Sequence, residues 1–208
     1  MKKIKYVFIL LLIGMLTFAF AACKDKNNDE EGKVGDNAYG AINDLIGKVS
    51  CPFTITSKTT ADGDTFNGTY VVTESNGVVS VAYSYEELST FETVNGELVA
   101  PPDYKRTATG SVKIKDGKVI ELSGEEANLS AEAFNLSSIV LSEDKLSEVT
   151  VGDGEFSAKI TSLKAVTGID VSAESATIDI KYTEEKITSL TLSYSTSSCQ
   201  TEIKYAFN

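Results

Sequence analysis

The sequence contains no histidine among its 208 residues. This absence excludes histidine-dependent catalytic triads and histidine-ligated zinc sites, and it removes the side chain that most often acts as a general base. The glycine-rich phosphate-binding patterns GxxxxGK[ST] and GxGxxG are also missing. Because no nucleophile can be paired with a base, we expect a protein that is not an enzyme and that uses no cofactor and no metal.

Basic residues are scarce as well. Lys and Arg number 19 against 30 Asp and Glu, which gives a formal net charge of −11. An acidic surface repels nucleic acid and anionic lipid headgroups. We therefore expect no nucleic-acid partner, and any attachment to a membrane has to come from a group other than basic side chains.

The first 22 residues have the composition of an export signal. Lys2, Lys3 and Lys5 form a basic start, and an almost wholly apolar run with small residues at its end follows. The 17 residues from 6 to 22 lie at the short end of the roughly 20 that a membrane-spanning helix needs. The pattern therefore favours a signal peptide at 1–22 over a permanent anchor.

Two cleavage sites compete at the end of this signal. Ala19-Phe20-Ala21 fits ordinary signal peptidase, which would release a soluble protein. The stretch up to Cys23 resembles instead the lipobox of bacterial lipoproteins, with small residues before a cysteine, although Phe20 stands where that family usually has Leu. This resemblance implies that Cys23 is diacylated and becomes the new N-terminus, and two acyl chains anchor a protein firmly where one binds only marginally.

The chain after Cys23 divides into a tether and one domain. Residues 24–36 contain Val34 as their single large apolar residue, so we predict a disordered tether over 23–36. The remaining residues, 37–208, are predicted to form a single β-rich domain. We expect a monomer that is held at the cell membrane or the outer envelope surface, outside the cytoplasm, by the diacylated Cys23.

Apolar periodicity sets the expected elements of the domain. A spacing of three and four predicts an amphipathic helix over 37–50 that covers one sheet face, with the apolar residues Ala38, Ala41, Ile42, Leu45, Ile46 and Val49. After Pro52 the period changes to two, which predicts strands, with hairpin turns at Asn76-Gly77 and Asp116-Gly117. The last three strands, within 177–207, are expected to form an antiparallel meander.

Two regions are harder to interpret from the sequence. Residues 86–106 contain Asn95-Gly96 and Pro101-Pro102, which predicts a long connecting loop, the kind of segment that often carries function. Residues 125–146 are compatible with a short helix capped by Ser130 and, over 136–141, with an edge strand. Residues 162–169 are predicted to form one or two helical turns.

These elements predict an α+β fold, in which a curved antiparallel β-sheet is covered by an N-terminal helix and short helices. The order of helix, long meander, short helix and three final strands resembles the half-barrel fold of bacterial lipoprotein carriers and related lipid-binding envelope lipoproteins. The resemblance is one of architecture over 37–208, and it implies an apolar ligand between the concave sheet face and the helix. The candidate ligand-facing residues are Tyr83, Tyr85, Leu190, Leu192 and Tyr194, and the alternative is that they are ordinary core residues.

Two classes of function follow. The first is a lipid-anchored protein that binds or carries an apolar or amphipathic ligand. The second is a structural or protein-interaction module of the cell envelope with a fully packed core, which would bind through the 86–106 loop or a strand edge.

Cys51 and Cys199 remain once Cys23 is assigned to lipid. In an exported chain they can form a disulfide, which would close a loop of 199 − 51 = 148 residues. The alternative is two free thiols.

Overall fold

The structure is a computed structural model that describes residues 36–61, 64–89, 92–95, 97–99, 104–124 and 131–207. These residues belong to one compact unit. The predicted signal peptide 1–22, the predicted lipidation site Cys23 and the predicted tether up to residue 35 lie outside the described residues. Asp36, the last residue of the predicted tether, already belongs to the first helix.

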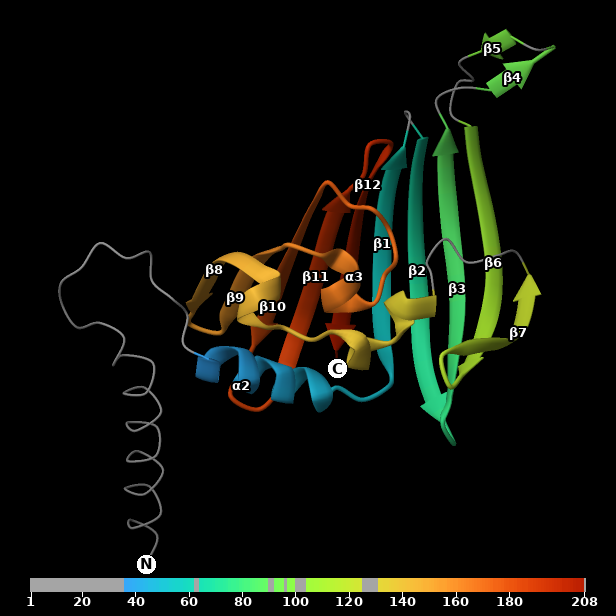
Figure 1. Ribbon diagram of the computed structural model, residues 1–208. Helices are drawn as coiled ribbons and strands as arrows, with labels where there is room; N and C mark the ends of the chain where they lie inside the picture. The colour runs from blue at the N-terminus through green and yellow to red at the C-terminus, as the bar shows by residue number, and fades with distance from the viewer. Residues whose placement is uncertain are drawn as a thin grey trace, which may run out of the picture. The chain divides into compact units, whose positions relative to one another are not determined.

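A ten-stranded antiparallel sheet forms the framework, and it is open because its two outermost strands do not pair with each other. Its strand order is β7-β6-β3-β2-β1-β12-β11-β10-β9-β8, so the pairing of β1 with β12 joins an N-terminal and a C-terminal meander (Figure 1). The strands are β1 Phe53–Ala61, β2 Asp64–Ser75, β3 Val78–Ser89, β6 Tyr104–Lys115, β7 Lys118–Gly124, β8 Leu146–Gly152, β9 Glu155–Ile160, β10 Ser175–Tyr182, β11 Ile187–Ser195 and β12 Cys199–Phe207. The predicted fold class and the final meander are confirmed.

Turn residues explain why the hairpins form where the sequence predicts them. Asn76 and Gly77 have φ values of 53° and 74°, and Asp116 and Gly117 have φ values of 50° and 72°. Two successive residues with positive φ make a type I′ turn, whose twist matches that of the flanking strands. Both predicted hairpins are therefore confirmed.

Helical segments cover one face of the sheet, which we call the inner face (Figure 1). They are α2 Asp36–Gly47, α3 Leu163–Thr167, and the 3-10 turns η1 Ala131–Phe134, η2 Leu136–Ser138 and η3 Glu143–Lys145. Strands near the centre alternate buried and exposed residues, as in β10 and β12. This alternation leaves the other face, which we call the outer face, to solvent.

Helix α2 packs through a stripe that differs in one position from the predicted one. Ile42, Leu45 and Ile46 are buried as expected, but Ala41 is exposed and Tyr39 is buried instead. The Tyr39 ring meets Phe156 of the sheet edge to face, with 6.3 Å between centroids and an interplanar angle of 76°. The larger apolar surface of tyrosine explains why it, and not alanine, faces the sheet.

The segment that the sequence left ambiguous contains 3-10 turns and no strand over 136–141. Leu141 donates its backbone N–H to Asn43 Oδ1 at 2.9 Å, and its carbonyl oxygen accepts from Asn43 Nδ2 at 2.8 Å. The Val140 N–H donates to the Val166 carbonyl at 2.9 Å. Because these backbone groups bond to α2 and α3, the alternative of an edge strand over 136–141 is wrong.

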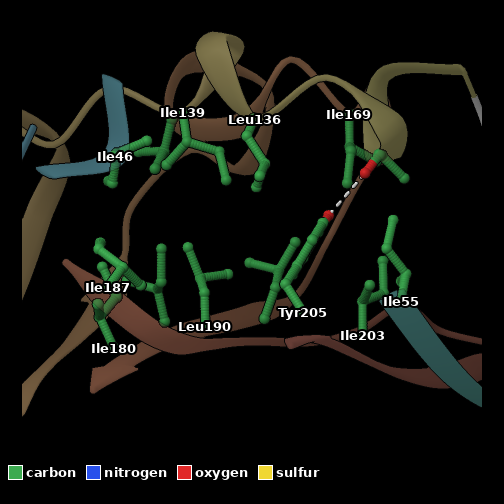
Figure 2. Close-up of a cluster of buried hydrophobic side chains, with 14 of the residues drawn as sticks. Ile46, Ile55, Leu136, Ile139, Ile169, Ile180, Ile187, Leu190, Ile203 and Tyr205 are labelled. Carbon is green, nitrogen blue, oxygen red and sulfur yellow. Dashed lines mark hydrogen bonds between the residues drawn. The ribbon is translucent and has the colours of Figure 1, made fainter. Parts of the chain in front are cut away.

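The core lies between the sheet and this cover. Figure 2 shows Leu190 and Ile203 of the sheet pointing toward Leu136, Ile139 and Ile169 of the cover. Among the side chains drawn, Tyr205 donates its hydroxyl to the Ala133 carbonyl at 2.9 Å. Burial raises the Tyr205 pKa far above its usual range, so this hydroxyl remains a donor.

The predicted loop over 86–106 is wrong at both ends. Strand β3 continues to Ser89 and β6 begins at Tyr104, with Glu86 forming an ion pair with Lys105 on the neighbouring strand. Between them lie the two short strands β4 Glu92–Val94 and β5 Glu97–Val99, which pair only with each other. The acidic residues looked like loop residues in sequence, but cross-strand lysine and arginine partners accommodate them in a sheet.

The two cysteines lie at opposite ends of strand β1. Cys51 precedes β1 by two residues, whereas Cys199 is opposite Ala61, the last residue of that strand. The 9 residues of β1 span about 30 Å at roughly 3.4 Å per residue, whereas a disulfide needs Cα atoms within about 7 Å. Both thiols are free, so the disulfide alternative is wrong.

We expect free-thiol titration of the unfolded, unreduced full chain to find the thiols of Cys51 and Cys199. Replacing either one by serine should lower the titrated number by one. Reductant should leave the thermal unfolding midpoint unchanged. Recovery of both thiols only after reduction would contradict the observed separation.

Candidate functional site

The structure places all five predicted ligand-facing residues on the inner face, in three successive rows that run across the strands. We call these rows lowest, middle and highest in the direction in which β1 runs from Phe53 to Ala61. The lowest row contains Tyr83 and Leu190, linked through Tyr70, Ile55 and Tyr205. The middle row contains Tyr85 and Leu192, linked through Gly68, Ser57 and Ile203. The highest row contains Tyr194.

Burial separates these five residues into two groups. Tyr83, Leu190 and Leu192 are only 5%, 1% and 0% exposed and belong to the hydrophobic core. Tyr85 and Tyr194 are half-buried at the margin of that core. The first three are therefore core residues, which is the alternative that the sequence left open. Their alternation along the strands is the same for core residues as for ligand-facing ones.

The highest row is the best candidate for a binding site, and we call it the cross-strand row. Its members lie directly opposite one another on neighbouring strands, and they are Glu87 (β3), Phe66 (β2), Thr59 (β1), Thr201 (β12) and Tyr194 (β11). Apart from the buried Thr201, these residues are half-buried. The row thus marks where the inner face passes from core to solvent.

The cross-strand row combines two aromatic side chains with three polar ones. Phe66 and Tyr194 are three strand intervals apart, about 14 Å at roughly 4.8 Å per interval. Between them the hydroxyls of Thr59 and Thr201 are hydrogen-bonded at 3.1 Å. Beyond Phe66, the Glu87 carboxylate lies 3.7 Å from the guanidinium of Arg106, the residue opposite it on β6.

Tyr194 supplies a hydroxyl that stays protonated. Burial raises its pKa, while the neighbouring Thr201 hydroxyl lowers it to a smaller extent. At neutral pH the phenol can therefore donate a hydrogen bond, next to an aromatic ring face that can contact apolar atoms.

Gly68 explains the shape of the inner face between Tyr85 and Ser57. A Cβ atom at Gly68 would lie 2.5 Å from the ring and hydroxyl of Tyr70, so the Tyr70 ring lies over this glycine. The same ring packs against Tyr83 and Phe134, with centroid separations of 5.8 Å and 5.5 Å. Tyr70 therefore closes the sheet surface just below the cross-strand row.

The hydroxyl of Tyr70 is buried without a hydrogen-bond partner in the part of the chain that the structure describes. Burial raises the Tyr70 pKa, and the nearby Ser57 hydroxyl lowers it to a smaller extent without reaching hydrogen-bond geometry. An unpaired buried hydroxyl costs about 1–3 kcal/mol.

We expect Tyr70→Phe to raise the free energy of unfolding by about 1 kcal/mol, because it removes this unpaired group. Tyr205→Phe is the matched control and should lower that energy by about 1–2 kcal/mol, since its hydroxyl bonds to Ala133. Urea unfolding of both variants measures the difference. Equal losses in the two would show that the Tyr70 hydroxyl is paired in solution.

The outer face carries a hollow of about 300 Å³. It lies over β12, β1 and β2 and is lined by Thr56, Ser57, Lys58, Asn67, Gly68, Thr69, Glu202 and Lys204. Lys204 forms an ion pair with Glu202 at 2.9 Å. Its charged and hydroxyl lining suits water or a small polar molecule better than an apolar ligand.

Membrane-spanning helices and metal-binding clusters are both absent from the described residues. No helix among them is long and apolar enough to cross a bilayer. No three His, Cys, Asp or Glu side chains in these parts of the chain converge on a point where a metal ion could be held.

Sequence reasoning missed Phe66, Thr59, Thr201 and Glu87. Phe66, Thr59 and Thr201 lie in strands, and Glu87 lies in the segment predicted as a loop. Their grouping depends on the register between β1 and β12, which lie at opposite ends of the domain sequence. No local pattern encodes that pairing.

Comparisons with known proteins assign the chain to no family, so its classification rests on the fold. No family model matches the chain. No curated protein matches it at a significant level. The class that the fold defines is an α+β domain with an open antiparallel sheet and a helical cover over one face.

Proposed function

We propose that the protein is an extracytoplasmic lipoprotein, anchored through a diacylated Cys23, that binds an amphipathic ligand without catalysis. The support for the anchor is the basic start, the apolar run and the small residues before Cys23. The acidic composition supports acyl chains over basic residues as the membrane attachment.

The observation that supports a ligand is the cross-strand row. Half-buried aromatic side chains at the margin of a core leave apolar surface in contact with water. Phe66 and Tyr194 of the cross-strand row and Tyr85 of the adjoining middle row are such side chains. Polar groups of Thr59, Thr201 and Glu87 lie between or beside them. Binding sites commonly combine aromatic surface with a few polar groups that fix orientation.

An amphipathic ligand fits this chemistry better than a purely apolar one. The wholly apolar side chains of the inner face, such as Leu190 and Leu192, are buried in the core and so are not accessible to a ligand. A ligand lying along the row would place apolar atoms on Phe66 and Tyr194 and hydrogen-bonding groups near the threonine hydroxyls.

A second candidate is a structural or protein-interaction module of the envelope. The observation that favours it is the same packed core, since Leu190, Leu192 and Ile203 are at most 1% exposed. In that case the tyrosines of the margin would contact a protein partner.

Native mass spectrometry of the full chain, purified from membranes in mild detergent, tests the ligand. We expect a bound small molecule on the wild-type protein that falls at least tenfold in occupancy in Tyr85→Ser/Tyr194→Ser. Tyr182→Ser is the matched control, because Tyr182 is also half-buried but lies in β10, outside both the middle row and the cross-strand row. Absence of any bound species, or equal occupancy in all three proteins, would favour the interaction module.

Metabolic labelling with an alkyne fatty acid tests the anchor separately. Label should appear on the wild-type chain and be lost in Cys23→Ser, with the protein then released from the membrane fraction. Normal processing of Cys23→Ser, together with no label on the wild type, would refute the lipoprotein assignment.

A further inference from the structure

The two edges of the ten-stranded sheet differ in how well they are protected against pairing. At the β8 edge, Glu148 has a φ of 49° and the pairing with β9 shifts register between Ser147 and Thr150. Glu148 also forms an ion pair with Lys159 at 2.5 Å. Bulges and charges of this kind hinder the addition of another strand, and β8 has no exposed large apolar side chain that would offset them.

The β7 edge also has a bulge and a charged pair, but it carries exposed apolar side chains. Every residue of β7 is exposed, and Val119, Ile120 and Leu122 are 54%, 55% and 46% exposed. We call these three residues the β7 patch. An apolar edge strand of this kind is a template for a further strand.

A bulge in β7 explains why the β7 patch lies beside the core. Val119 is opposite Ile114 and Leu122 is opposite Val112, so Ile120 is the extra residue between them. Ile114 and Val112 are both buried on the inner face. The bulge therefore keeps Val119 and Leu122 on that same face, where they extend the apolar surface of the core to the edge of the sheet.

We propose that β7 pairs antiparallel with β7 of a second copy of this chain, so that the two sheets become continuous. In the symmetric register that sets Val119 opposite Ile120 of the second copy, Lys118 is opposite Glu121 of the second copy. The two-fold symmetry repeats each of these pairs, so Val119 meets Ile120 twice and each Lys118 meets a carboxylate, while Leu122 lies opposite Gly117 of the second copy. The strand is thus complementary to itself.

Charge favours this register over its neighbours. Glu121 accepts from Lys113 of its own chain at 2.7 Å, and its second carboxylate oxygen can accept from Lys118 of the second copy. A slide that sets Glu121 opposite its own counterpart would bring two carboxylates together. The proposal departs from the monomer expected from sequence, and it does not depend on the ligand assignment.

Charge exchange in trans tests the pairing on the full chain in detergent. Wild-type copies with two different affinity tags are co-expressed, and the fraction that co-purifies is measured together with the mass by analytical ultracentrifugation. We expect a dimer for the wild type and at least a fivefold loss of co-purification for Lys118→Glu alone and for Glu121→Lys alone. Co-expression of the two variants should restore it. The introduced glutamate of one variant then meets the introduced lysine of the other, and the unchanged Glu121 of the first meets the unchanged Lys118 of the second.

Several outcomes overturn the proposal. They are a monomeric wild type, single variants that co-purify as well as the wild type, and a mixture that is not restored. Repulsion between the introduced lysine and Lys113 within one chain cannot mimic restoration, because it is the same in the single variant and in the mixture. Lys159→Glu, in β9 next to the β8 edge, is the control and should leave co-purification unchanged. Circular dichroism checks that each variant is folded.

Discussion

Leu192→Ala should lower the free energy of unfolding by about 2–5 kcal/mol, the range for removing a fully buried leucine side chain and leaving a cavity. Leu192 is 0% exposed and lies in the middle of β11, between Ile203 of β12 and Ile178 of β10. Its neighbours are held in the sheet by backbone pairing on both sides, so they can collapse only partly into the space. Urea unfolding followed by circular dichroism measures the loss.

The same variant separates a core role from a ligand-binding role. Leu88→Ala serves as the control, since Leu88 is 38% exposed in a neighbouring part of the same sheet and should change the free energy by about 1 kcal/mol or less. If Leu192 lined an accessible ligand site, its truncation would reduce ligand occupancy and leave stability nearly unchanged. That result would contradict the packing of this row.

Gly68→Ala should be destabilising by about 1–3 kcal/mol, the usual cost of forcing an extra methyl group into a packed interior. The new Cβ would lie 2.5 Å from the ring and hydroxyl of Tyr70, which is 0% exposed. Tyr70 cannot swing aside freely, because Tyr83 and Phe134 pack against its ring. The methyl group therefore has to displace an aromatic cluster.

A double-mutant cycle with Tyr70→Val checks this cause. In the Tyr70→Val background, where the ring is gone, Gly68→Ala should cost less than half of its effect in the wild type. Gly40→Ala in α2 is the matched control: nothing lies within 4 Å of its added Cβ, and it should be stabilising by up to about 1 kcal/mol. An equal cost of Gly68→Ala in both backgrounds would mean that strain elsewhere in β2 dominates.

Much of the fold follows from local patterns. The helix predicted over 37–50 and found over 36–47, and the hairpins at Asn76-Gly77 and Asp116-Gly117, depend on periodicity and turn chemistry within a few residues, so the sequence predicts that they exist. The errors occur where a distant partner decides the outcome. Residues 136–141 end in an apolar run that is compatible with a strand, but the backbone groups of Val140 and Leu141 bond to Val166 and Asn43.

The candidate site was predictable only in part. Alternation correctly placed Tyr85 and Tyr194 on one sheet face, but it could not distinguish them from Leu190 and Leu192, because all four follow the same period. Burial differs along one face according to where the helical cover ends, and no strand encodes that boundary.

The sequence by itself determined the acidic composition, the absence of histidine, the basic start and apolar run before Cys23, and the N-terminal helix and the two hairpins. These properties depend on residue types and on neighbours close in the chain. The tertiary structure decided the register of β1 with β12, the separation of the two cysteines, the cross-strand row and the open β7 edge. Each of these depends on pairing between segments far apart in sequence, where a shift of one residue would exchange the two faces of a strand.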